Sequence, residues 1–290
     1  MFKNVIIASD LSKDSSALVK NFGTLKPYGI EKCLLLQFWD MLEILGINNF
    51  YRPTVLIDFE KNLKNQKEIL EKQGYEVEAR LLSGFSTNEV YKIAEEEGYS
   101  AVVVGTDKYI FSSMANELIH NAQKPVLIVK FDSESDEAMV GFKQDNSDKI
   151  ADHILFPTDF SKNAEVAFDC LLEMAEKGKV NKVTLVHVQD EYRLSPYLDD
   201  RIEEFNKIDT ERLEKMQKTL KDKGAAKVDI ALKYGFPSVK IMQLVKERDI
   251  QLVIMGSQGR GFVKEFFLGS VSHNIARQSP TSVLLIPAKR

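Results

Sequence analysis

The chain has 290 residues, about twice the length of a typical single domain, which favours two domains. Its 44% hydrophobic and 28% charged residues lie near the averages of globular proteins and exclude a disordered, collagen-like or disulfide-scaffold chain. The 39 basic and 43 acidic residues give a formal charge of −4. This balance argues against a nucleic-acid-binding protein, because such proteins need a concentrated basic surface.

The distribution of apolar residues predicts a soluble cytoplasmic protein without a membrane segment. A membrane helix needs about 20 predominantly apolar residues, and no segment of the sequence reaches that length. The apolar run at residues 5–8 ends before Asp10 and is too short for the core of a signal peptide. Cys33 and Cys170 lie far apart in apolar stretches, so we expect both to be buried thiols in a reducing compartment.

Four motifs occur in the same order in both halves of the chain and indicate an internal repeat. The matching pairs are residues 4–12 and 153–161, 84–86 and 235–237, 101–106 and 251–257, and 125–129 and 280–286. We therefore expect two copies of one domain, at residues 1–131 and 150–290. Residues 132–149 are rich in acidic side chains and poor in apolar ones, so they are interpreted as a solvated linker.

Within each copy, short runs rich in Val, Ile and Leu alternate with longer amphipathic stretches. The expected strands include residues 5–8, 101–104 and 126–129 in the first copy and residues 154–157, 183–188, 228–233, 252–255 and 283–286 in the second. Nearly continuous hydrophobic runs are typical of strands buried on both faces of a parallel sheet. The alternation predicts two tandem doubly wound, Rossmann-like α/β domains, each with a five-stranded parallel sheet of order 3-2-1-4-5.

In such a sheet, strands 1 and 4 lie side by side, and ligands bind in the crevice beyond their carboxyl ends. The candidate residues at this crevice in the second copy are Pro157, Thr158 and Asp159 after strand 1 and Gly256, Ser257, Gly259, Arg260, Gly269, Ser270 and Val271 after strand 4. Glycines allow backbone N–H groups to approach an anion, and the helix expected at residues 271–278 presents its positive end. The second copy is therefore predicted to contain a phosphate-binding cradle, in which Ser270 caps the helix or donates to phosphate.

The spacing Gly256-x2-Gly259-x9-Gly269-Ser270 resembles the nucleotide-binding pattern of the universal stress protein family, G-x2-G-x9-G-[S/T]. The aspartate after strand 1 and His187-Val188 at the end of strand 2 are also similar to that family. The resemblance implies an adenine nucleotide, ATP or AMP, accompanied by Mg²⁺ when ATP is bound. It places adenine and ribose near Thr158, Asp159, Val188, Met255 and Gly256, and phosphates near Gly259, Arg260, Gly269, Ser270 and Val271.

The first copy departs from this pattern. Gly105 keeps the first glycine, Lys108 replaces the second, and Asp107 adds a negative charge where phosphate would lie. The loop is four residues shorter, which aligns residues 114–115 with residues 269–270. The sequence therefore predicts one competent site per chain, in the second domain.

Three functions stay open at this point. The first is a nucleotide-binding regulatory protein of the stress response, favoured because the sequence has no recognisable catalytic motif and no metal-ligand spacing. The second is a slow ATPase or phosphotransfer enzyme that uses Asp159 with a divalent ion. The third is a scaffold in which the glycine loop only closes the sheet, and Asp10 and Asp159 cap helices.

The family resemblance also implies that two such domains pair through strand 5. We therefore expect residues 126–129 and 283–286 to pair within the chain, and a homodimer is the further assembly considered. Pairing would cover an apolar edge strand, which proteins normally protect.

Overall fold

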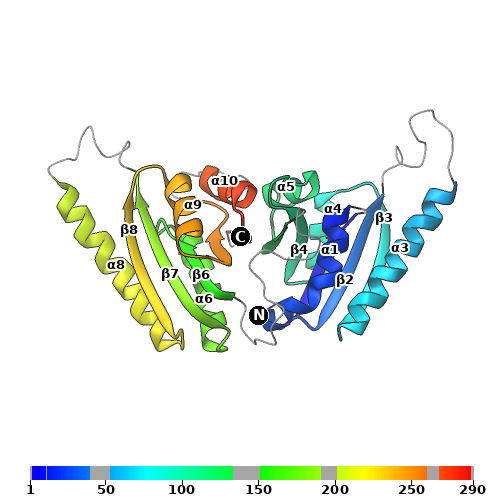
Figure 1. Ribbon diagram of the computed structural model, residues 1–290, viewed down its shortest axis with the longest axis horizontal. Coiled ribbons are helices and arrows are strands. Elements are labelled where there is room, and N and C mark those ends of the chain that lie inside the picture. The colour runs from blue at the N-terminus through cyan, green and yellow to red at the C-terminus, as the bar shows by residue number, and fades with distance from the viewer. Residues whose placement is uncertain are drawn as a thin grey trace. The chain divides into compact units, whose positions relative to one another are not determined.

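The computed structural model describes residues 2–10, 12–39, 53–132, 151–190, 201–259 and 268–288. The chain divides into two compact units, Met1–Met139 and Val140–Arg290 (Figure 1). Each unit contains five parallel strands connected through helices, which confirms the predicted α/β fold. Most of the predicted linker lies outside the described residues, so its bounds stay a prediction.

The first unit alternates strands and helices along the chain. Its elements are β1 (Asn4–Ser9), α1 (Lys13–Asn21), the 3-10 helix η1 (Phe22–Tyr28), β2 (Lys32–Trp39), α3 (Pro53–Lys72), β3 (Glu76–Ser83), α4 (Thr87–Glu96), β4 (Ala101–Asp107), α5 (Ser113–His120) and β5 (Val126–Phe131). The strands pair in the order β3-β2-β1-β4-β5. This is the predicted order 3-2-1-4-5.

The second unit repeats this arrangement. Its elements are β6 (Ala151–Pro157), α6 (Lys162–Glu176), β7 (Val180–Gln189), α8 (Ile202–Asp222), β8 (Lys227–Tyr234), α9 (Pro237–Glu247), β9 (Leu252–Gly256), α10 (Ser270–Gln278) and β10 (Ser282–Ile286). The strand order is β8-β7-β6-β9-β10. Helix α6 contacts α8 and α9 contacts α10, so a pair of helices covers each face of the sheet.

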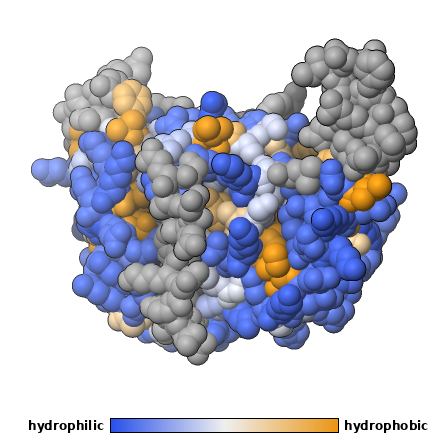
Figure 2. Space-filling model, turned by 45° about the vertical axis from the view of Figure 1, so that its right-hand side comes forward, coloured by the Kyte–Doolittle hydropathy of each residue, from blue (hydrophilic) through white to orange (hydrophobic). Residues whose placement is uncertain are grey.

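The central strands form the core of each unit. Every residue of β9 and β10 is buried, and so are five of the six residues of β1. This explains why their sequences lack the polar alternation of a half-exposed strand. Most of the molecular face shown in Figure 2 is hydrophilic, with hydrophobic side chains confined to separate small patches. Among the described helices, none is long and apolar enough to cross a membrane.

The two cysteines are free thiols with different surroundings. Cys33 is fully buried on β2, as predicted, and burial raises the pKa of its thiol to about 12. Cys170 lies on α6 but is not among the buried residues of that helix, so the expectation of full burial was wrong for it. An apolar stretch in a helix shows that one face is buried but does not place each of its residues on that face.

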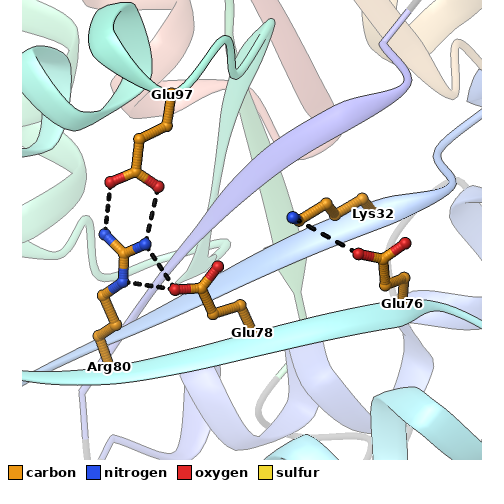
Figure 3. A network of polar contacts seen from close by, with 5 residues as sticks. All are labelled: Lys32, Glu76, Glu78, Arg80 and Glu97. Carbon is orange, nitrogen blue, oxygen red and sulfur yellow. Dashed lines mark hydrogen bonds and ion pairs between the residues drawn. The ribbon is translucent and has the colours of Figure 1, made fainter.

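A network of charged side chains lies along β3, the edge strand of the first unit (Figure 3). Arg80 donates two hydrogen bonds to Glu97, with N–O distances of 2.6 and 2.7 Å, and a bond of 2.8 Å to Glu78. Glu97 is the C-cap residue of α4, so Arg80 ties this helix to the sheet edge. The hydrogen bonds from Arg80 lower the pKa of Glu97 below its ordinary value.

We predict that Glu97→Gln lowers the free energy of unfolding of the first unit by about 0.5–1 kcal/mol at pH 7, since solvent screens this half-exposed pair. A lowered pKa stabilises the fold above the unfolded-state pKa, and this stabilisation is lost as pH falls through the folded-state pKa. The difference from wild type should therefore vanish in strongly acidic buffer. Urea unfolding measures it, with Glu96→Gln as a control in an exposed pair at 3.9 Å. Equal losses in both variants would contradict the assigned role of Arg80.

Candidate functional site

The two strands whose ends were predicted to border a crevice in the second unit are neighbours in its sheet. β6 ends at Pro157 and β9 ends at Gly256, and the two strands pair through Ile154 with Leu252 and through Leu155 with Val253. The segments that continue from these strands therefore leave the sheet side by side. This brings the two groups of candidate residues to the same edge of the sheet, where the crevice is expected.

The Asp159 side chain, which follows β6, lies close to Gly259 in the segment that follows β9. One carboxylate oxygen, Oδ1, accepts a hydrogen bond of 3.0 Å from the backbone N–H of Ser161. The other oxygen, Oδ2, lies 2.7 Å from the position that a Cβ atom would occupy at Gly259. A side chain at Gly259 would therefore require this carboxylate to move, whereas glycine leaves it in place.

The aspartates after the first strands do not cap the following helices. Ser161 caps α6 by accepting a bond of 3.2 Å from the N–H of Ala164, and Ser12 caps α1 in the same way. Asp159 and Asp10 accept a bond from the backbone N–H of that serine instead. The alternative that Asp10 and Asp159 are N-cap residues was therefore wrong, because Asp-x-Ser places the serine at the cap.

Asn163 holds the loop that follows β9. Its side-chain Oδ1 accepts a bond of 2.8 Å from the N–H of Gln258, and its Nδ2 donates to the carbonyl of Ile286 at 3.2 Å. A Cβ atom at Gly256 would lie 2.6 Å from Asn163 Oδ1. Sequence reasoning did not single out Asn163. The available signal was its matching position with Asp14, since each is the second residue of its helix.

The N-terminus of α10 faces the same loop. Gly269 is the N-cap residue, with φ −64° and ψ 145°, and within the described part of the chain no side-chain cap bond is made at this helix start. The N–H of Gly269 donates to the carbonyl of Ser257 at 2.8 Å, and the Ser272 hydroxyl donates to the carbonyl of Gly256 at 2.9 Å. These bonds bring the helix start to the end of β9, where its N–H groups and positive dipole favour an anion.

The candidate residues named from the sequence occupy these segments. Pro157, Thr158 and Asp159 lie on one side of the crevice, and Met255, Gly256, Ser257 and Gly259 lie on the other, with Gly269, Ser270 and Val271 at the start of α10. Met255 is 6% exposed, so its side chain contributes mainly to the core. Arg260 lies outside the described residues.

His187 ties the end of β7 to the crevice, with Val188 next to it on the same strand. Its Nδ1 atom lies 2.7 Å from the carbonyl oxygen of Thr158, which only accepts, so Nδ1 carries the hydrogen. Its Nε2 atom lies 3.5 Å from Asp209 Oδ2 on α8. His187 is 7% exposed, so it is a buried, hydrogen-bonded histidine.

An aromatic residue with an unusual backbone packs on this histidine. The Phe160 ring lies 4.6 Å from the His187 ring, and Arg212 lies 5.2 Å from the Phe160 ring centroid. Phe160 has a φ of 56°, in the left-handed region that side chains other than glycine rarely adopt. Such strain costs about 1–3 kcal/mol and is tolerated where the surroundings fix it, here between β7 and α8.

The matching turn of the first unit closes on its own side chains. Asp107 Oδ1 accepts bonds from the N–H groups of Tyr109 and Ile110, at 2.6 and 3.0 Å. Ser112 is the N-cap of α5 and accepts a bond of 3.1 Å from the N–H of Ala115. The first unit therefore supplies its own acceptors for the backbone N–H groups of this region.

This geometry corrects the alignment of the two loops. Ser112 lies 7 positions after Gly105, whereas Gly269 lies 13 positions after Gly256, and both are N-cap residues. The second loop is therefore six residues longer, not four. Residues 112–113, rather than residues 114–115, match residues 269–270. The two prolines before the last strands do not occupy matching positions. Val126 pairs with Val102 and Val283 pairs with Val253, so Pro125 matches Ser282. Aligning Pro125 with Pro280 therefore misplaced the helix start by two residues.

Comparisons with known proteins agree with the duplicated fold. The sequence model of the universal stress protein family matches residues 1–130 and 151–287. A universal stress protein from Methanocaldococcus jannaschii is 32% identical over 155 residues, which cover 47% of this chain and 94% of the relative. The crystal structure of a universal stress protein from Archaeoglobus fulgidus is 22% identical and covers 100% of both chains, with a TM-score of 0.72.

We predict that Gly256→Ala destabilises the second unit by about 1–3 kcal/mol, because the new Cβ would meet Asn163 Oδ1 at 2.6 Å and its backbone carbon at 3.1 Å. Gly23→Ala is the control, since its nearest neighbour is a Gln73 side-chain atom at 3.7 Å. Urea unfolding followed by circular dichroism compares the two variants. A loss no larger than that of the control would show that the loop has room for a side chain.

Proposed function

Because the chain belongs to the universal stress protein family, we propose that its second unit binds an adenine nucleotide and that the protein acts as a nucleotide-dependent regulator in the stress response. The main support for this proposal is the difference between two matching helix starts. Ser112 caps α5 with its own side chain, whereas Gly269, the N-cap of α10, has no side chain to offer. A phosphate group would supply an acceptor at this helix start.

The phosphates would lie along the loop after β9 and the start of α10. Glycine at positions 259 and 269 keeps side chains away from the backbone there, and Ser270 and Val271 begin the helix. Arg260 is proposed to neutralise phosphate charge. Either ATP or AMP suits this cradle, and Mg²⁺ would accompany ATP by neutralising its additional phosphates.

The adenosine part would lie on the strand ends. Pro157, Thr158 and Asp159 border the crevice on the β6 side, Val188 follows the buried His187, and Met255, Gly256 and Ser257 form the β9 side. Asp159 and His187 already fix the backbone around this space through their hydrogen bonds to Ser161 and Thr158. A pocket formed in advance lowers the ordering cost of binding.

The regulatory function is favoured over catalysis by the surroundings of Asp159. Its Oδ1 accepts the Ser161 N–H, and its Oδ2 lies against Gly259. At least one carboxylate oxygen of Asp159 therefore has a structural role, which disfavours it as the base of a slow ATPase or phosphotransfer enzyme. Incubation with ATP and Mg²⁺ checks this directly, since turnover that is lost on Asp159→Ala would support the enzyme.

We further propose that β5 and β10 are covered by strand pairing, within the chain or between chains of a homodimer. Within its own unit each of these apolar strands has one partner strand, β4 for β5 and β9 for β10. An unpaired apolar edge promotes aggregation, so covering it is favourable.

We predict that Gly269→Asp weakens ATP and AMP binding by about 100-fold or more, because its carboxylate would occupy the helix start as an internal anion and repel phosphate. The backbone of Gly269 suits a cap residue, so the fold should be retained. Ser112→Asp is the matched control, since it replaces one cap residue by another in the first unit and should leave affinity unchanged. Isothermal titration calorimetry measures both. Unchanged affinity in Gly269→Asp would remove the proposed site from the start of α10.

A further inference from the structure

Two pairs of matching residues differ in charge between the crevices of the two units. Asn163 is the second residue of α6, whereas Asp14 is the second residue of α1. Gln258 and Asp107 each lie two positions after the glycine of the fourth strand of their unit. The second unit is therefore neutral at both positions, and the first unit carries a carboxyl group at both.

The neutral pair positions the loop of the second unit. Asn163 is 6% exposed, and its Oδ1 accepts the N–H of Gln258 at 2.8 Å. Its Nδ2 donates to the carbonyl of Ile286 at 3.2 Å. One buried amide thus joins the start of α6, the loop after β9 and the end of β10 without adding charge to the crevice.

The first unit makes the same backbone contact with a carboxylate. Asp14 Oδ2 accepts the N–H of Asp107 at 2.9 Å, and the Asp107 carboxylate itself is 5% exposed. Burial raises the pKa of Asp14, and the neighbouring charge of Asp107 raises it further, against the effect of the backbone hydrogen bond. An anion entering this crevice would meet two carboxyl groups.

A buried lysine compensates these carboxyl groups in the first unit. Lys130 on β5 is fully buried, pairs in register with Thr106, and has its Nζ 4.7 Å from the Phe111 ring centroid. Burial lowers its pKa to about 8, while Asp107 and Asp14 act in the opposite direction. In the second unit the position that matches Lys130 is Pro287, so this unit has neither an acid at the two matching positions nor this cation.

We propose that these two positions decide which unit accepts an anionic ligand: neutral Asn163 and Gln258 admit phosphate to the second unit, whereas Asp14 and Asp107 exclude it from the first. This inference rests on the proposed nucleotide site and adds the residues that select the charge of its ligand. Asn163 is a positioning residue, because it acts through the backbone of Gln258. A single added carboxylate within about 8 Å of a phosphate group is sufficient to weaken binding about tenfold or more.

The test compares Asn163→Asp and Gln258→Glu with wild type, using calorimetric titration with ATP, AMP and uncharged adenosine. Each variant should bind ATP about tenfold or more weakly, with a smaller loss for AMP and adenosine affinity within about twofold of wild type. Asn163→Ala is the neutral control. It removes the positioning contacts without adding charge, so it should weaken ATP and adenosine to the same extent.

Equal losses for ATP and adenosine in both acidic variants would overturn the charge selection while leaving the nucleotide site in place. If wild type binds none of the three compounds, the proposed function fails and this inference fails with it. Gln258→Glu retains the backbone contact to Asn163. It therefore decides the question if Asn163→Asp does not fold.

Discussion

The start of a helix presents backbone N–H groups that have no partner within the helix. The two units share one fold but differ in how they satisfy these groups. In α5, the Ser112 side chain accepts one of these groups, and the preceding turn closes on the Asp107 carboxylate. In α10, the cap residue is Gly269, which has no side chain to offer. The same fold therefore gives one helix start that its own cap side chain satisfies and one whose cap residue is glycine, where we propose the anion site.

Close packing within the protein, without any ligand, favours glycine at two positions of the loop. A Cβ atom at Gly256 would meet Asn163, and one at Gly105 would lie 2.8 Å from the backbone oxygen of Asp14. This explains why the first copy retains its first glycine although it is not expected to bind a nucleotide. At the second glycine, Gly259, a Cβ atom would require the Asp159 carboxylate to move, and the matching place in the first copy is taken by Lys108. Glycine at these positions thus permits close packing, and it also leaves the backbone accessible to a ligand.

Sequence patterns were sufficient for the framework of the fold. Continuous hydrophobic runs identified the buried strands, and the repeat together with the crossover rule fixed the strand order within each unit. The crevice followed from that order, because neighbouring strand ends bring distant residues together.

Contacts between distant segments could not be predicted in the same way. The bond from Gln258 to Asn163 links residues 95 positions apart, and neither residue type indicates its partner. The loop alignment failed because a helix start is marked by its cap residue, here Ser112 or Gly269, and not by the proline that follows the helix. The alternative that the aspartates cap their helices arose because Asp and Ser are both favoured at that position, and only geometry distinguishes them.

The most direct test of this asymmetry is the number of nucleotides bound per chain. Calorimetric titration of the purified full-length protein with ATP, repeated with AMP, measures that number without any substitution. The contrast between the starts of α5 and α10 predicts one nucleotide per chain. Two per chain would show that the acids and cap of the first unit do not exclude phosphate, and none would show that an uncapped helix start in this crevice is not a nucleotide site.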